Sequence, residues 1–256
     1  MARSFWNGAV SFGVVDVPIK VYAATDPTGV QFRELHEPDA GEIAHRLIDD
    51  DGKEIDREQV VKGFEVRSGE YVVLDDDEIK AATAPRRKAV EIEHFVPRKQ
   101  IDPDYYERPY YLEPQDGAQE AYRVLALALQ RTGRVGIGRV VLRSREQLVG
   151  VLEADGMLRM HTMRFADELV DAKSLDMPAL QRKPEPKMHK MAATLVDELT
   201  TTFQPGRFKD TYRDRVMDLV KRKARGEEID VEAATPPEPS DDLVAALEAS
   251  LKGAKR

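Results

Sequence analysis

The chain has 256 residues, with 39 Lys and Arg against 47 Asp and Glu, so its formal net charge is −8. Charged residues make up 34% of it, above the ~25% typical of globular domains. The absence of Cys excludes disulfides, thiolate metal sites and cysteine nucleophiles. The longest apolar run, 124–129, is too short to cross a membrane, and the N-terminus lacks an apolar signal segment. We therefore expect a cytoplasmic protein.

The first 165 or so residues have the pattern of a mainly antiparallel β domain. Short β-branched and aromatic segments are separated by turn signals such as Asp49-Asp50-Asp51-Gly52. Strict alternation in 89–96 and 157–164 predicts strands with one buried face. The β segments that we expect cover residues 9–15, 17–22, 44–48, 53–55, 59–66, 71–74, 89–96, 105–112, 135–143, 147–153 and 157–164.

Helical spacing of apolar residues begins at residue 118. In 118–130, helical spacing relates Ala121, Leu125, Ala128 and Leu129, and Gly133 is a stop signal. Further helices are expected at 77–82, 187–202, 207–225 and 241–252. The acidic, Pro-rich segment between the last two predicts a stiff linker.

The charge is unevenly divided along the chain. Residues 37–78 hold 15 acidic and 5 basic residues, whereas 131–145 hold five arginines and no acid. On an extended strand, Arg139 and Arg143 share a face, which places guanidinium groups in a line suited to a phosphate backbone. The alternative is a solvated outer face of the β domain.

No pattern of catalytic residues stands out. The five histidines (His36, His45, His94, His161 and His189) lack metal-ligand spacing, and no G-x-S-x-G elbow occurs. The glycines of 133–138 lack a phosphate-loop Lys and favour a bend or a close backbone approach instead. The acidic run 75–78 is typical of the start of a helix. We expect no enzymatic activity, no cofactor and no metal.

The C-terminal segment has its own pattern. Four apolar residues, Leu243, Val244, Leu247 and Leu251, share one face of a short amphipathic helix beyond the linker. Such a helix suits docking into a groove of another protein. The alternative is that it folds back onto its own chain.

Eight segments resemble, in order, those of the bacterial Ku family, the DNA-end-binding proteins of non-homologous end joining. They are FWNGAVSFG at 5–13, VPIKVY at 17–22, VVKGFE at 60–65, YYERPYYL at 105–112, GRVVLRSRE at 138–146, LRMHTMRF at 158–165, residues 203–220, and DLVAALEASL at 242–251.

The resemblance implies a Ku-core antiparallel β-barrel with a helical C-terminal arm, mainly β with α, assembled as a ring-shaped homodimer. It implies a core with DNA-encircling hairpins at 1–180, an arm for dimer or core packing at 181–226, a linker at 227–240, and a ligase-docking helix at 241–256. Some relatives carry cysteines in the stretch corresponding to 36–53, where this chain has Asp and Glu, so no zinc is expected.

The function implied is sequence-independent binding of double-stranded DNA ends in double-strand break repair, with recruitment and stimulation of the ATP-dependent ligase D. It implies a nucleoid-associated protein with neither membrane nor small-molecule substrate as partner. The candidates for phosphate contact are Lys20, Lys62, Arg131, Arg134, Arg139, Arg143 and Arg145, followed by Arg207 and Lys209.

Two alternatives from other classes stay open. One is an RNA- or single-strand-binding β-barrel that stacks bases on Tyr105, Tyr106, Tyr110 and Tyr111. The other is a hydrolase that uses a cluster of Asp and Glu with a metal ion.

Overall fold

The structure is a computed structural model that describes residues 3–39, 41–82, 87–143, 145–176, 185–229 and 243–254. The chain forms two compact units, Met1–Thr28 with Arg33–Ser174, and Gly29–Phe32 with Leu175–Arg256. The predicted end of the core, at residue 180, and most of the predicted linker at 227–240 lie outside the described residues.

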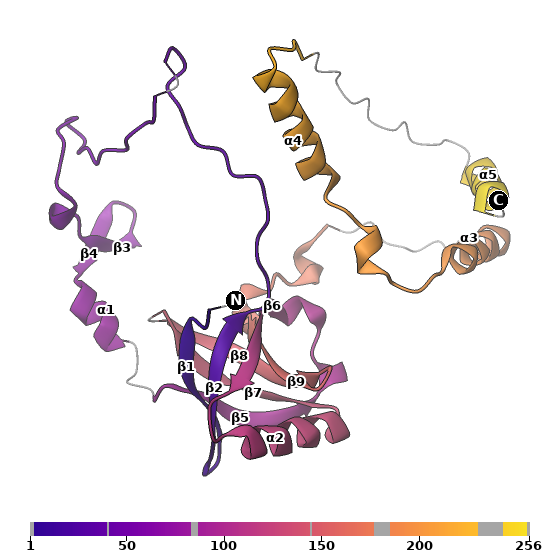
Figure 1. The fold of residues 1–256 in the computed structure, drawn as a ribbon, viewed down its shortest axis with the longest axis horizontal. Coiled ribbons are helices and arrows are strands. Elements are labelled where there is room, and N and C mark those ends of the chain that lie inside the picture. The colour runs from indigo at the N-terminus through magenta and orange to yellow at the C-terminus, as the bar shows by residue number, and fades with distance from the viewer. Residues whose placement is uncertain are drawn as a thin grey trace. The chain divides into compact units, whose positions relative to one another are not determined.

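Within the described residues, the first unit contains a closed barrel of seven strands (Figure 1). Around the barrel the strands follow the order β1, β2, β6, β9, β8, β7 and β5. Every neighbouring pair is antiparallel except β1 and β5, which are parallel. This confirms the expected β-barrel. The strands are β1 (Trp6–Phe12), β2 (Val15–Ala23), β5 (Ala89–Pro97), β6 (Tyr106–Pro114), β7 (Arg134–Leu142), β8 (Arg145–Ala154) and β9 (Met157–Met163).

The barrel is filled by alternate residues of its strands, as the period-2 pattern predicts. Val17, Ile19 and Val21 of β2 are fully buried, and so are Leu158 and Met160 of β9. These side chains belong to one apolar cluster. Burial of this cluster out of water is the main stabilisation of the fold.

Helix α2 (Gln119–Thr132) lies against one end of the barrel (Figure 1). Its Leu125 and Leu129 enter the same apolar cluster. The Tyr122 hydroxyl donates a hydrogen bond to the carbonyl oxygen of Leu112 at 2.7 Å and accepts one from the amide of Leu158 at 2.8 Å. Tyr122 therefore holds α2 at the barrel end where β6 finishes and β9 begins.

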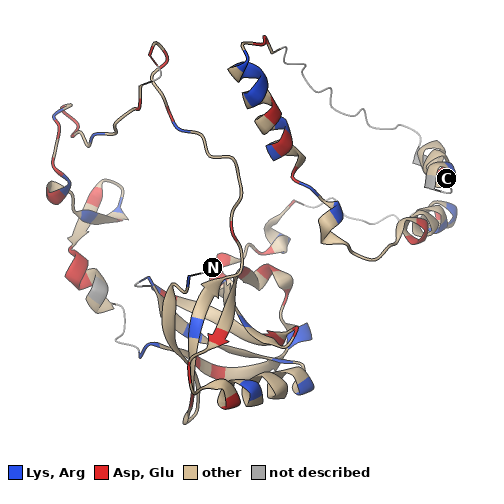
Figure 2. Ribbon diagram, viewed as in Figure 1, with Lys and Arg blue, Asp and Glu red and all other residues tan. Residues whose placement is uncertain are grey.

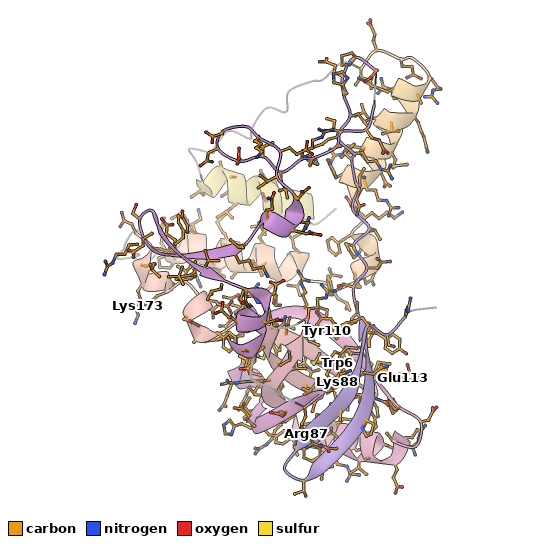
Figure 3. All side chains as sticks on the ribbon, turned by 90° about the vertical axis from the view of Figure 1, so that its left-hand side faces the viewer. Trp6, Arg87, Lys88, Tyr110, Glu113 and Lys173 are labelled. Atoms are coloured by element: carbon orange, nitrogen blue, oxygen red, sulfur yellow. The ribbon has the colours of Figure 1, made fainter. Side chains whose placement is uncertain are left out.

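Two glycines let β5 close the barrel. A Cβ on Gly8 would lie 2.3 Å from the carbonyl oxygen of Lys88 and 2.2 Å from the Trp6 ring, two residues labelled in Figure 3. A Cβ on Gly138 would lie 2.0 Å from the carbonyl oxygen of Glu91. The close-approach interpretation of the glycines in 133–138 is therefore confirmed for Gly138.

Between β2 and β5 the chain forms a two-stranded ribbon, β3 (Lys62–Arg67) and β4 (Glu70–Leu74), followed by α1 (Asp76–Ala82). All ribbon residues are exposed. The predicted hairpin of 44–48 with 53–55 is wrong as a pair of strands, because only an isolated bridge joins Ile48 to Glu54. These segments have no buried face, and a two-stranded hairpin is marginal without one.

The second unit contains α3 (Pro186–Leu199), α4 (Thr211–Ala224) and α5 (Leu243–Ala254). Their bounds agree with the predicted helices to within a few residues, apart from the start of α4. The Asp210 side chain accepts hydrogen bonds from the amides of Tyr212 and Arg213, so the helix begins there and not at residue 207. Helix α5 packs against α3.

Candidate nucleic-acid interface

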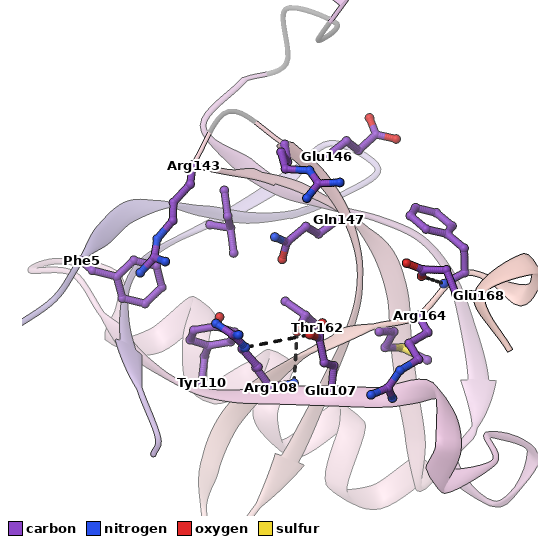
Figure 4. Close-up of a pocket in the computed structure, with 14 residues that line it drawn as sticks. Phe5, Glu107, Arg108, Tyr110, Arg143, Glu146, Gln147, Thr162, Arg164 and Glu168 are labelled. Atoms are coloured by element: carbon purple, nitrogen blue, oxygen red, sulfur yellow. Dashed lines mark hydrogen bonds and ion pairs between the residues drawn. The ribbon is translucent and has the colours of Figure 1, made fainter. Parts of the chain in front are cut away.

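A polar pocket opens at the barrel end opposite α2. Because β7 and β8 are antiparallel, the end of β7 and the start of β8 meet there, together with the end of β9 and the start of β6. The cavity volume is about 540 Å³. We call it the mouth pocket; its lining includes Phe5, Arg108, Tyr110, Arg143, Arg145 and Gln147 (Figure 4).

Arg143 occupies the turn that joins β7 to β8. Its φ is 50°, in the left-handed region that favours glycine and asparagine. β7 ends at Leu142, so Arg143 does not continue the strand face of Arg139 as the sequence predicted. The turn instead directs Arg143 toward the Phe5 side of the mouth pocket (Figure 4).

Arg143 and Arg145 are the free cations of this end. Both side chains are exposed, and neither forms an ion pair or side-chain hydrogen bond with another residue in the described ranges. Arg164, in contrast, donates to the carbonyl oxygens of Asp104 and Tyr106 at 2.8 and 3.0 Å. Its guanidinium is thus partly used to hold the loop before β6.

The three glutamates that line the pocket already have partners. Glu107 accepts a hydrogen bond from the Thr162 hydroxyl at 3.3 Å. Glu168 accepts one from the Phe165 amide at 2.6 Å. Glu146 pairs with Arg139 at 3.0 Å and points away from the cavity (Figure 4). The lining has four arginines, Arg108, Arg143, Arg145 and Arg164, against these three glutamates, so the pocket keeps a net positive charge that attracts an added anion.

Arg139 lies in the middle of β7 between two carboxylates. Its Nε is 3.3 Å from Glu93 of β5, and its Nη1 is 3.0 Å from Glu146 of β8. Its side chain is 40% exposed. The predicted line of guanidinium groups along this strand is therefore interrupted at Arg139 by cross-strand ion pairs.

The other predicted contacts lie in separate places. Arg131 and Arg134 are exposed at the α2 end, and eight steps of about 3.3 Å along β7 separate Arg134 from Leu142 by about 26 Å. Lys20 lies 3.9 Å from Glu113, and Lys62 of the ribbon lies 2.8 Å from Asp76.

Arg207 and Lys209 belong to the second unit, where both are exposed. The last turn of α4 adds Lys221, Arg222 and Lys223 to the basic residues of this unit (Figure 2).

Three of the four tyrosines proposed for base stacking contact other side chains of the barrel. Tyr110 contacts Phe5 with ring centroids 5.4 Å apart. The Tyr111 ring lies under the Arg159 guanidinium at 5.7 Å. Tyr106 meets His161 edge-on at 5.1 Å. Burial, followed by the positive charges of Arg159 and Arg98, lowers the pKa of His161 below its usual value.

No sequence pattern indicated Phe5, Arg108, Arg164 and Gln147 as pocket residues. They come from four separate segments, so only the strand register brings them together. No cluster of three or more metal-ligating side chains occurs in the residues that the structure describes. Among the same residues, no helix is long and apolar enough to cross a membrane.

Comparison with known proteins places this barrel in a family. A family model described as the Ku70/Ku80 beta-barrel domain matches residues 11–191. The Non-homologous end joining protein Ku of Anaeromyxobacter sp. (strain K) is 40% identical over 259 residues, covering 100% of this chain and 87% of that protein. The chain belongs to the Ku family.

Two further Ku relatives cover nearly the whole chain. The Non-homologous end joining protein Ku of Bacillus subtilis (strain 168) is 36% identical over 99% of this chain and 83% of its own length. The Non-homologous end joining protein Ku 2 of Geotalea uraniireducens (strain Rf4) is 38% identical over 97% of both chains. The match therefore extends beyond the Ku barrel into the helices of the second unit.

The helix predicted to dock a Ku partner is α5. Its Val244, Leu247 and Leu251 are half-buried, and the helix packs against α3, which carries Met191 and Leu195 at half-buried positions. This is the arrangement in which the helix folds back onto its own chain. The Leu243 side chain lies outside the described part of the chain.

Proposed function

We propose that this Ku protein binds double-stranded DNA ends without reading their sequence, as a ring-shaped homodimer, in non-homologous end joining. Family membership supports end joining. The observation that carries phosphate binding is that Arg143 and Arg145 stand unpaired with any described residue at one barrel end. Arginine binds phosphate oxygens through two parallel hydrogen bonds, and such contacts position a duplex without reading it.

Topological binding explains how an acidic protein selects DNA ends. With a net charge of −8, the protein is repelled from DNA as a whole. A ring with a basic inner surface attracts the duplex only along its lumen, and a closed ring is entered at a free end. In this proposal the ribbon of β3 and β4 is the hairpin that crosses the duplex, and the arm at 181–226 serves dimer or core packing.

The test is a gel shift with a linear duplex. Arg143→Glu with Arg145→Glu reverses two charges and is expected to abolish binding, while size-exclusion chromatography shows an intact dimer. Affinity for the wild type falls by about 10³ to 10⁵ between low and moderate salt if six to ten phosphates are contacted. Binding by the double variant equal to that of the wild type would contradict the assignment of these arginines.

The second part of the proposal is recruitment of the ATP-dependent ligase D through α5. The support is the resemblance together with an apolar face that α3 covers only in part. Holding the ligase at a DNA end raises its effective concentration there. Truncation after residue 235 is expected to preserve end binding and to abolish ligase stimulation; retained stimulation would refute this part.

The single-strand-binding alternative is less well supported. Tyr106 and Tyr111 contact His161 and Arg159, and of the four tyrosines proposed for stacking only Tyr110 lines the mouth pocket, so the four rings do not form one stacking platform. We propose a non-enzymatic role at DNA ends, which places the protein on the nucleoid.

A further inference from the structure

The mouth pocket is the wrong size for a duplex and the right size for one nucleotide. Its volume of about 540 Å³ falls within the range of small-ligand sites, roughly 300–1,000 Å³. A cube of that volume has an edge of about 8 Å, which is less than the ~12 Å width of the major groove alone. Arginines that serve only to follow a duplex backbone do not require a cavity of this kind.

The lining of the mouth pocket combines phosphate-binding and base-binding groups. Arg143 and Arg145 line it with no partner in the described residues, and the four arginines of the lining outnumber its three glutamates. Phe5 lies beside the Arg143 side chain and forms an aromatic wall with Tyr110, with ring centroids 5.4 Å apart (Figure 4). Gln147 points into the space between them, where its amide can both donate and accept hydrogen bonds (Figure 4).

Local backbone strain supports a functional reason for arginine in this turn. A two-residue hairpin turn with positive φ favours Gly, Asn or Asp, yet residue 143 is arginine at φ 50°. A non-glycine residue held in this region is strained, and such strain clusters at binding sites. The turn thereby directs a guanidinium toward the cavity at the expense of local stability.

We propose that the mouth pocket receives an unpaired, 5′-phosphorylated nucleotide at the end of the bound DNA. Arg143 and Arg145 bind its phosphate, Phe5 and Tyr110 contact the base face, and Gln147 meets the base edge. This deepens the proposed function, on which it rests: the barrel holds the terminal unpaired residue while the ring holds the duplex. The chemistry recognised is a nucleoside 5′-phosphate.

The experiment uses the full-length dimer and a fluorescent, 5′-phosphorylated thymidine trinucleotide, with binding followed by anisotropy at low salt. The trinucleotide is expected to bind the wild type, and its 5′-hydroxyl form to bind about tenfold more weakly, because charge-assisted phosphate contacts are lost. Inorganic phosphate at the same concentration is expected not to displace it. A blunt duplex is measured in parallel, so that failure of end binding is seen separately.

Two variants locate the site. Gln147→Trp fills the cavity without changing the charge and is expected to abolish trinucleotide binding. Arg145→Gln changes an exposed side chain and is therefore expected to leave the fold intact. It is expected to weaken trinucleotide binding about tenfold. Arg123→Gln is the matched control, because Arg123 is exposed on α2 at the other barrel end. If Gln147→Trp fails to fold by circular dichroism, the comparison of Arg145→Gln with Arg123→Gln decides.

Three results would overturn the inference while leaving the proposed function intact. They are duplex binding without trinucleotide binding, equal trinucleotide affinity in the wild type and the folded pocket variants, and displacement by inorganic phosphate as effective as by unlabelled trinucleotide. Failure of the wild-type protein to bind the blunt duplex would instead overturn the proposed function itself.

Discussion

Arg139 and Glu146 form a 3.0 Å ion pair across β7 and β8. This pair, with Glu93 on the other side of Arg139, divides five closely spaced arginines into groups with different roles. Arg131 and Arg134 lie at the α2 end, Arg139 belongs to the barrel wall, and Arg143 and Arg145 face the mouth pocket. The basic stretch is therefore two cationic sites at opposite ends of one strand.

The strained turn at Arg143 is expected to lower the stability of the fold while placing a phosphate-binding side chain. Arg143→Gly removes the cost of positive φ and is expected to raise the free energy of unfolding by up to about 1 kcal/mol, since glycine adopts this region freely. The same change removes a phosphate contact, so affinity for a linear duplex falls. Urea unfolding and anisotropy measure the two effects.

Arg145→Gly is the matched control for this prediction, because Arg145 begins β8 and has an ordinary backbone conformation. Glycine there is expected to lower both stability and affinity. Equal destabilisation by the two glycine variants would show that the turn carries no strain.

The Tyr122 hydroxyl is expected to be a large single contribution to barrel stability. Tyr122→Phe leaves the buried amide of Leu158 and the carbonyl of Leu112 without this partner, which costs about 1–3 kcal/mol. The measurement is the urea midpoint. Tyr71→Phe, on the ribbon and 61% exposed, is the control and is expected to change little. A loss no greater than that of the control would contradict the role given to this bridge.

His161 is expected to make stability depend on pH below neutrality. Its folded pKa lies below the unfolded value of 6.5, so the unfolded chain binds the proton more tightly. The stability contribution is therefore complete above pH 6.5 and is lost as the pH falls toward the folded pKa. His161→Gln is expected to flatten this part of the curve of urea midpoint against pH, and an unchanged slope would assign it to other groups.

The barrel could be predicted because its strands alternate cleanly, as in the buried Leu158 and Met160 of β9. Only part of the mouth pocket could be predicted from the sequence. Arg143 and Arg145 stand out by composition, but Phe5 and Arg108 reach the same pocket through pairings of β1, β2, β6 and β9 that no local pattern encodes.

The ion pair of Arg139 with Glu93 could not be predicted for the same reason. The two residues are 46 positions apart in the sequence, and only the register of β5 against β7 brings them together. The hairpin predicted near Asp49 is wrong because turn signals alone do not supply a buried face.

Competition between cut and closed forms of one plasmid tests directly whether the ring is threaded by DNA. The two forms share sequence, length and phosphate charge and differ in whether they have ends, so a threaded ring binds the cut form alone. We expect the labelled linear duplex to be displaced by cut plasmid and not by relaxed closed circles at the same phosphate concentration. Equal displacement by the closed circles would contradict threading and with it the binding of DNA ends by a closed ring.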